Sequence, residues 1–180
     1  MKTLETERLI LRPFVLSDLD DFFEYCSLET VGPNAGWAVH KSKEFSKKII
    51  ENFIEKDDVL ALYHKEDKKV IGSIGLHKKT EDDLGEYYEI GYVLSTPYEG
   101  LGLMTETVKR VIEHAFNDLK LPIVYCEHFI ENSKSRRVIE KCYFKCIGNK
   151  IYKSIDFGDK ESKFYSLKKE DYIKYMEEKK

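Results

Sequence analysis

A strand that runs through two closely spaced glycines into an amphipathic helix is the feature that most restricts the fold of this sequence. The run Tyr87-Tyr-Glu-Ile-Gly-Tyr-Val-Leu94 predicts a strand, and apolar residues at helical spacing from Met104 to Phe116 predict a helix. Gly100 and Gly102 lie between them. Glycines at such a junction let backbone N–H groups turn toward one point, where the helix N-terminus adds partial positive charge. The junction therefore predicts either a phosphate site or simply a tight turn.

Two common nucleotide-binding motifs are missing at this junction. No Gly-Lys-Ser/Thr follows the glycines, and no third glycine stands at the dinucleotide-binding spacing. Nucleotide hydrolysis and hydride transfer are therefore not indicated. The net charge of -3, from 30 basic and 33 acidic residues, provides no broad positive field, so we expect no nucleic-acid partner.

Length and composition indicate one globular unit. With 180 residues, 42% of them hydrophobic, the chain can bury a core, and we expect residues 1–180 to form a single domain. No apolar run approaches the ~20 residues of a membrane span, so we expect a cytoplasmic protein with no membrane partner. The four cysteines, Cys26, Cys126, Cys142 and Cys146, are expected to be reduced thiols in the core.

Periodicity and turn signals predict the remaining elements. Helices are expected from a capping box at Ser17 to about residue 26, over 42–54, and from Asn132 to 142. Strands are expected over 7–12, 59–63, 70–76, 123–126, 144–152 and 163–167. Residues 32–37 are expected to form an irregular loop, and 169–180 a terminal helix or tail. This order predicts an α/β (α+β) fold with a mixed, mostly antiparallel central sheet flanked by helices.

Four segments together resemble the GNAT family of N-acetyltransferases, and within it the ribosomal-protein N-terminal (Rim-type) branch. They occur in that branch's order and spacing, and the resemblance covers residues 4 to about 167. They are Thr6–Pro13, Glu89–Leu94, Gly100-Leu-Gly102 with Glu106, and Asn132–Ser135 before Glu140–Phe144. The resemblance implies a GNAT-like fold and an acetyl group that moves from acetyl-CoA to a primary amine by direct attack in a ternary complex.

The resemblance also implies a place for acetyl-CoA. Its pantetheine arm would lie in a splay between the strands around Tyr92 and Tyr125, along the backbone of Tyr92, Val93 and Leu94, and Asn132 would help to hold it. Its pyrophosphate would rest on the backbone amides of the turn and the first helical residues, which are Gly100, Leu101, Gly102, Leu103, Met104 and Thr105.

Ser135 is the candidate for protonating the leaving thiolate. It lies one turn after Asn132 and resembles the serine that Rim-type enzymes place near that sulfur. The alternative is that Ser135 only caps or packs the start of a helix.

Glu89 is the candidate base, which would take the proton of the amine through a water molecule. Strand alternation places it with Gly91 on one face, while Ile90 and Tyr92 take the other. The alternative is that Glu89 faces solvent or a neighbouring lysine. The five histidines lack metal-ligand spacing, so we expect no metal.

Three residues depart from the family pattern. Glu99 puts a negative charge beside the phosphate turn, Ile139 stands where many members have the tyrosine that protonates the thiolate, and Tyr143 replaces the glycine before Phe144. These departures support an alternative function, a catalytically inactive CoA-binding sensor or interaction module of the same fold.

The acceptor class is left open by the sequence. A protein N-terminus and a small amine, such as an antibiotic or a polyamine, both fit the resemblance. Acidic residues at Glu81-Asp-Asp83 and Glu86 are placed to attract a cationic acceptor, although charged hairpin tips are usually just solvated. We count a homodimer among the assemblies that the chain can form.

Overall fold

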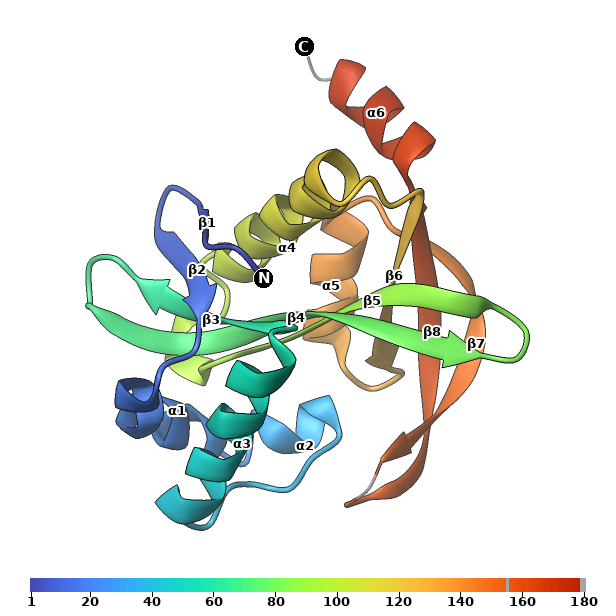
Figure 1. The fold of residues 1–180 in the computed structure, drawn as a ribbon. Coiled ribbons are helices and arrows are strands. Elements are labelled where there is room, and N and C mark those ends of the chain that lie inside the picture. The colour runs from blue at the N-terminus through green and yellow to red at the C-terminus, as the bar shows by residue number, and fades with distance from the viewer. Residues whose placement is uncertain (155, 179–180) are drawn as a thin grey trace.

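The computed structural model describes residues 1–154 and 156–178, through which one eight-stranded sheet runs (Figure 1). The strand order is β1-β2-β3-β4-β5-β6-β8-β7. The strands are β1 Leu4–Glu5, β2 Leu9–Pro13, β3 Val59–His64, β4 Lys69–Glu81, β5 Gly85–Leu94, β6 Ile123–Phe129, β7 Lys145–Ser154 and β8 Gly158–Lys168. All neighbouring pairs are antiparallel except β5 and β6, which confirms the predicted mixed, mostly antiparallel sheet.

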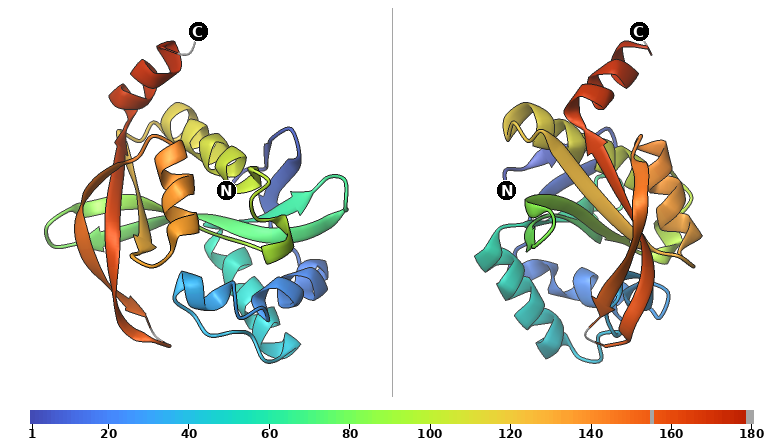
Figure 2. Two further views of the ribbon diagram at one scale, coloured as in Figure 1. Left: turned by 180° about the vertical axis from the view of Figure 1, so that it is seen from behind. Right: turned by 90° about the vertical axis from the view of Figure 1, so that its right-hand side faces the viewer.

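Helices cover both faces of this sheet (Figures 1 and 2). One face carries α1 Leu19–Cys26, α2 Gly32–Ala35 and α3 Lys43–Lys56. The opposite face carries α4 Leu103–Glu113 and α5 Ser133–Lys141, and α6 Lys169–Glu177 extends past the end of β8. Among the described residues, none of the helices has the length and apolar character needed to span a bilayer.

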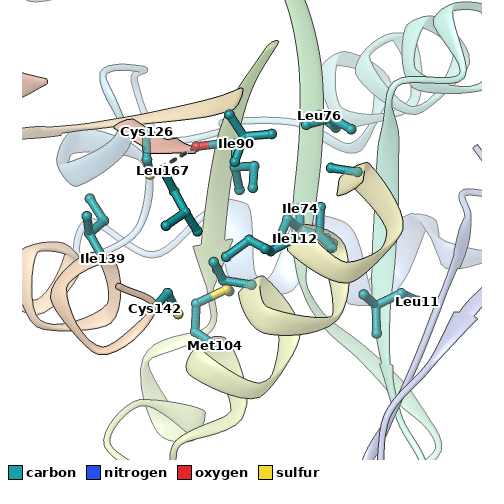
Figure 3. Packing of buried hydrophobic residues seen from close by; sticks show 14 of the residues in the cluster. Leu11, Ile74, Leu76, Ile90, Met104, Ile112, Cys126, Ile139, Cys142 and Leu167 are labelled. Atoms are coloured by element: carbon teal, nitrogen blue, oxygen red, sulfur yellow. Dashed lines mark hydrogen bonds between the residues drawn. The ribbon is translucent and has the colours of Figure 1, made fainter. Parts of the chain in front are cut away.

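The larger core lies between the sheet and the two helices α4 and α5. In β5, Ile90 points into this core beside Cys126 of β6, whose thiol donates to the carbonyl of Ile90 at 3.2 Å (Figure 3). Met104 and Ile139 bring α4 and α5 onto the same cluster. Because side chains alternate along a strand, the neighbours of Ile90 face the opposite side, toward α1–α3. This alternation decides on which face of the sheet each side chain of β5 lies.

Three local predictions were wrong. Residues 32–37 contain the short helix α2 in place of an irregular loop, and Gly36 ends it at a φ of 90°. Ser17 caps nothing, because the carboxylate of Asp18 accepts from the Val15 amide and from Arg12. Cys146 is exposed on the edge strand β7, whereas the other three cysteines are buried as expected.

Tyr143, which stands where the family pattern has glycine, adopts the left-handed conformation with a φ of 69°. This conformation strains a residue with a side chain by roughly 1 kcal/mol. The Tyr143 ring stacks on Tyr175 of α6 with centroids 5.0 Å apart, and Lys109 of α4 lies 5.4 Å above it. Aromatic stacking of this kind is worth about 0.5–1.5 kcal/mol, which offsets the strain and holds α6 against the turn that follows α5.

Candidate active site

A cavity of about 1570 Å³ passes from one face of the sheet to the other. It is lined on the α4–α5 side by Gly100, residues 102–105 and Ser135, and on the α1–α3 side by His77, Glu89 and Trp37. The passage exists because β5 and β6 pair at only two positions, Glu89 with Tyr125 and Ile90 with Cys126. Beyond Ile90 the strands diverge. The backbone of residues 91–94 is therefore bonded to β4 on one edge and open on the other.

The glycine junction has the backbone geometry of an anion site. Gly100 and Gly102 have φ values of 78° and 80°, and α4 begins directly after them with no side-chain cap. Among the hydrogen bonds of the described residues, none uses the N–H groups of residues 102–105. The first N–H groups of a helix need an acceptor, and here they face the cavity.

Arg8, in the turn before β2, fixes the shape of this loop. Its Nη1 donates to the Leu101 carbonyl at 2.9 Å, and its Nε donates to Glu106 at 2.9 Å. Its backbone N–H also donates to Glu106, at 3.0 Å. The sequence contained Arg8 and Glu106 in the segments that resemble the family, but their 98-residue separation hid their contact.

The clamp between Arg8 and Glu106 persists at neutral pH. Burial acts to raise the pKa of Glu106, but hydrogen bonds from Thr6 and Arg8 outweigh it and bring the pKa below its ordinary value of 4.5. A carboxylate whose pKa is lowered by folding stabilises the folded state above its unfolded pKa. That contribution is lost as the pH falls through the folded value. The loop should therefore loosen only under acid conditions.

Ser135 and Tyr92 meet on the α4–α5 side of the passage. The Ser135 hydroxyl lies 2.9 Å from the Tyr92 hydroxyl, and Tyr92 also donates to the Ser135 carbonyl at 3.2 Å. The sequence singled out Tyr92 only for its backbone, so this phenol was missed as a partner of Ser135. Burial raises the pKa of Tyr92 well above its ordinary value, so the phenol keeps its proton at working pH.

Asn132 caps α5, as its sequence position predicted. Its Oδ1 accepts from the Ser135 amide at 3.0 Å, and its Nδ2 donates to the Asn34 carbonyl of α2 at 3.2 Å. The side chain thus joins helices from the two faces of the sheet. Since Asn132 already supplies the cap, the Ser135 hydroxyl is not needed for capping and bonds to Tyr92 instead.

Glu89 lies on the α1–α3 side of the cavity and is buried, with its side chain 8% exposed. Its Oε1 accepts from Lys79 at 2.6 Å, while its Oε2 has no hydrogen-bond partner among the described residues. Burial acts to lower the pKa of Lys79, but Glu89 outweighs this and the pKa lies above its ordinary value. On the neighbouring strand β6, burial raises the pKa of Glu127. Glu89, which lines the cavity, therefore has one carboxylate oxygen, Oε2, that receives no hydrogen bond from the described residues.

Glu99 forms an ion pair with Lys134, which stands in the first turn of α5. Both side chains line the cavity, so the pair bridges its mouth beside the glycine loop. The carboxylate therefore lies near the loop but already has a positive partner.

Aromatic side chains line the α1–α3 side of the cavity. Trp37 lies beside His40 with ring centroids 5.2 Å apart, and Phe129 and Tyr152 pack edge to face at 5.2 Å. The segment after α2 is tied to the far end of β7, because Ser154 donates to the Gly36 carbonyl at 2.6 Å.

Comparisons with known proteins agree on one family. Residues 8–145 match the model of the acetyltransferase (GNAT) domain. YjcK of Bacillus subtilis, described as a probable N-acetyltransferase, is 28% identical over 153 residues, which are 78% of this chain and 82% of YjcK.

Solved structures show the same fold. A GNAT-family acetyltransferase from Bacillus anthracis superposes with a TM-score of 0.82 at 22% identity, covering 94% of this chain and 99% of its own. The ribosomal-protein-S5-alanine acetyltransferase of Vibrio fischeri superposes with a TM-score of 0.75 at 21% identity, covering 96% and 99%.

Proposed function

This chain belongs to the acetyltransferase (GNAT) family, and from that premise we propose that it moves an acetyl group from acetyl-CoA to a primary amine in a ternary complex. Membership makes it an acyltransferase enzyme. The observation that carries the proposal is the passage between β5 and β6, which has an anion-binding loop at one end and a buried carboxylate at the other. This arrangement favours an enzyme over an inactive CoA-binding module. We also propose that residues 1–180 act as one domain.

The residues present fit acetyl-CoA, which supplies a thioester carbonyl to an attacking amine. The N–H groups of residues 102–105 would hold the pyrophosphate, with Gly100 and Leu101 shaping the loop. The open backbone edge of Tyr92, Val93 and Leu94 would pair with the pantetheine amides as an added strand does. Asn132 would border that arm from the start of α5.

Two side chains would move protons. Ser135, supported by the Tyr92 phenol, would donate its proton to the leaving thiolate and regain one from the attacking nitrogen, since this pair lies on the α4–α5 side with the proposed CoA site. Glu89 would accept a proton from the amine through its unpaired Oε2, directly or through water. Lys79 would hold the Glu89 carboxylate in position. Positioning and these two transfers can supply most of the acceleration, because a thioester needs little electrophilic help.

A protein N-terminus is the acceptor that we propose first. The support is the Rim-type character of the segments at Thr6–Pro13 and Asn132–Ser135, together with the fold shared with the Vibrio fischeri enzyme.

The decisive experiment has two parts. Titration calorimetry should show CoA and acetyl-CoA binding, and free-thiol release should be followed with short peptides, polyamines and aminoglycosides as acceptors. Thiol release with peptides alone would support an N-terminal acetyltransferase, and release with small amines alone would move the proposal to that class. CoA binding without release from any amine would favour the inactive module.

Replacing Arg8 by glutamine should weaken CoA binding about 10-fold. The substitution removes charge-assisted hydrogen bonds to Leu101 and Glu106, each worth about 1.5–3 kcal/mol, and part of that energy fixes the loop. Calorimetry measures the change. Arg136→Gln is the control, because Arg136 pairs with Glu140 on the surface of α5. Equal affinities for wild type and Arg8→Gln would mean that the clamp does not shape the phosphate site.

Replacing Glu99 by glutamine should tighten CoA binding by roughly 0.5–1 kcal/mol, the scale of an exposed ion pair. The change releases Lys134 to face the phosphates and removes a negative charge from the mouth of the cavity. High salt should shrink the gain, because screening already weakens the repulsion in the wild type. Calorimetry at two salt concentrations checks both statements. A variant that binds no better at low salt would place Glu99 outside the phosphate site.

A further inference from the structure

One proton has to leave the acceptor site in every turnover of the proposed reaction, on which this inference rests. An ammonium and a thioester become an amide and a thiol, so one proton is released to solvent for each ammonium consumed. Glu89, the proposed proton acceptor, has a side chain that is 92% buried, the complement of its 8% exposure. A buried carboxylate needs a neighbour that connects it to water.

His77 on β4 stands directly across the strand pair from Glu89. Cross-strand partners in an antiparallel sheet have Cβ atoms about 4.5–5.5 Å apart and share one face. The His77 side chain is 35% exposed and lines the same cavity as Glu89. The ring therefore lies on the same face as the buried carboxylate and has an edge in solvent.

Two glycines make room for the His77 ring over the centre of the sheet. A Cβ on Gly75 would lie 2.3 Å from His77 Nε2, and a Cβ on Gly91 would lie 3.6 Å from it. Any larger residue at Gly75 would displace the ring. The ring thus occupies the space that side chains at these two positions of β4 and β5 would fill.

Asp58, just before β3, orients the ring. Its Oδ2 lies 2.8 Å from His77 Nδ1. A carboxylate at Nδ1 favours the neutral tautomer with the proton on Nδ1, which leaves the Nε2 lone pair directed into the cavity. Nε2 makes no hydrogen bond within the described part of the chain. Among the described residues, the other charged groups that line the cavity from the α1–α3 side are Lys41, Lys79, Glu89, Glu127, Lys153 and Asp156.

We propose that His77, held by Asp58, relays the acceptor proton from Glu89 to solvent. The N–H bond of the ammonium breaks and its proton passes to Glu89, directly or through water. Water in the cavity then carries the proton from Glu89 to Nε2, and the imidazolium loses it to solvent at its exposed edge. Each group returns to its starting state and no other reactant is needed. His77 acts through Glu89 and is a positioning and relay residue.

The test compares His77→Gln and Asp58→Asn with wild type over a pH range. Both variants should keep CoA affinity and lower kcat by about 10-fold near neutral pH, less than the loss of a direct base. The deficit should narrow toward about pH 9, where more acceptor arrives as the free amine. His77→Ala should regain activity on addition of free imidazole, which a purely structural role would not produce. His64→Gln is the matched control, because His64 forms a similar pair with Asp67 at a distant turn.

A second readout does not depend on activity. The ¹⁵N shifts of His77 in the protein without ligand should show the Nδ1–H tautomer, and Asp58→Asn should change them. Full activity and an unchanged pH profile in His77→Gln, or the opposite tautomer in wild type, would overturn the relay alone. A wild type that acetylates no amine would overturn the proposed function and the relay with it.

Discussion

The variant Gly102→Glu should lose CoA binding, with a Kd raised by on the order of 10²-fold or more, which corresponds to about 2.7 kcal/mol. Gly102 has a φ of 80°, a conformation that costs a residue with a side chain roughly 1–2 kcal/mol. A Cβ there would lie 3.6 Å from the Arg8 guanidinium, so a carboxylate would compete with Leu101 and Glu106 for Arg8. The same carboxylate would repel the phosphates. Titration calorimetry measures the loss.

Two controls separate strain from charge. Gly102→Ala carries the strain alone and should weaken binding less than Gly102→Glu. Gly85→Glu places a similar charge at a φ of 66° in the turn between β4 and β5, where nothing lies within 4 Å of a new Cβ. It should leave CoA affinity unchanged. Wild-type affinity in a folded Gly102→Glu protein would show that the phosphates bind elsewhere.

Replacing Ser135 by alanine should lower kcat by on the order of 10²-fold while CoA affinity stays near the wild-type value, because a donor to the thiolate acts mainly in the transition state. The fold should tolerate the change, since the Ser135 amide keeps its bond to Asn132. Stopped-flow measurement of thiol release, with calorimetry beside it, gives both quantities.

Ser133→Ala is the matched control, because Ser133 is an exposed serine in the same helical turn. Tyr92→Phe should cost less than Ser135→Ala. The double variant should lose less than the sum of both losses, since the two hydroxyls act as one unit. A Ser135→Ala enzyme with the wild-type rate would restrict Ser135 to packing at the start of α5.

Most of the fold was predictable from local patterns, since every long helix and every strand except the two-residue β1 carries its own periodicity. The glycine junction and the Asn132 cap were predictable for the same reason, because their function depends on residues a few positions apart. The contact of Arg8 with Leu101 was not, since 93 residues separate the two and only tertiary packing joins them. Helix α2 was missed because it is four residues long and ends at the glycine that signalled a turn.

The acceptor side shows a second limit of local patterns. Glu89 was placed on the correct face by alternation, but its partner Lys79 depends on the register of the hairpin. The same register sets His77 opposite Glu89, and Asp58 joins from another strand connection. The sequence contained His77 as an isolated residue at the end of a strand, with no signal for its partner.

Because β5 diverges from β6, the two halves of the sheet are joined by only two residue pairs. A CoA molecule bound in this opening, as proposed above, would act as a missing strand and would favour the folded state alone. Such a ligand adds about 2.7 kcal/mol of stability at one hundred times its Kd. The resistance of the protein to unfolding and to proteolysis should then rise with the concentration of CoA.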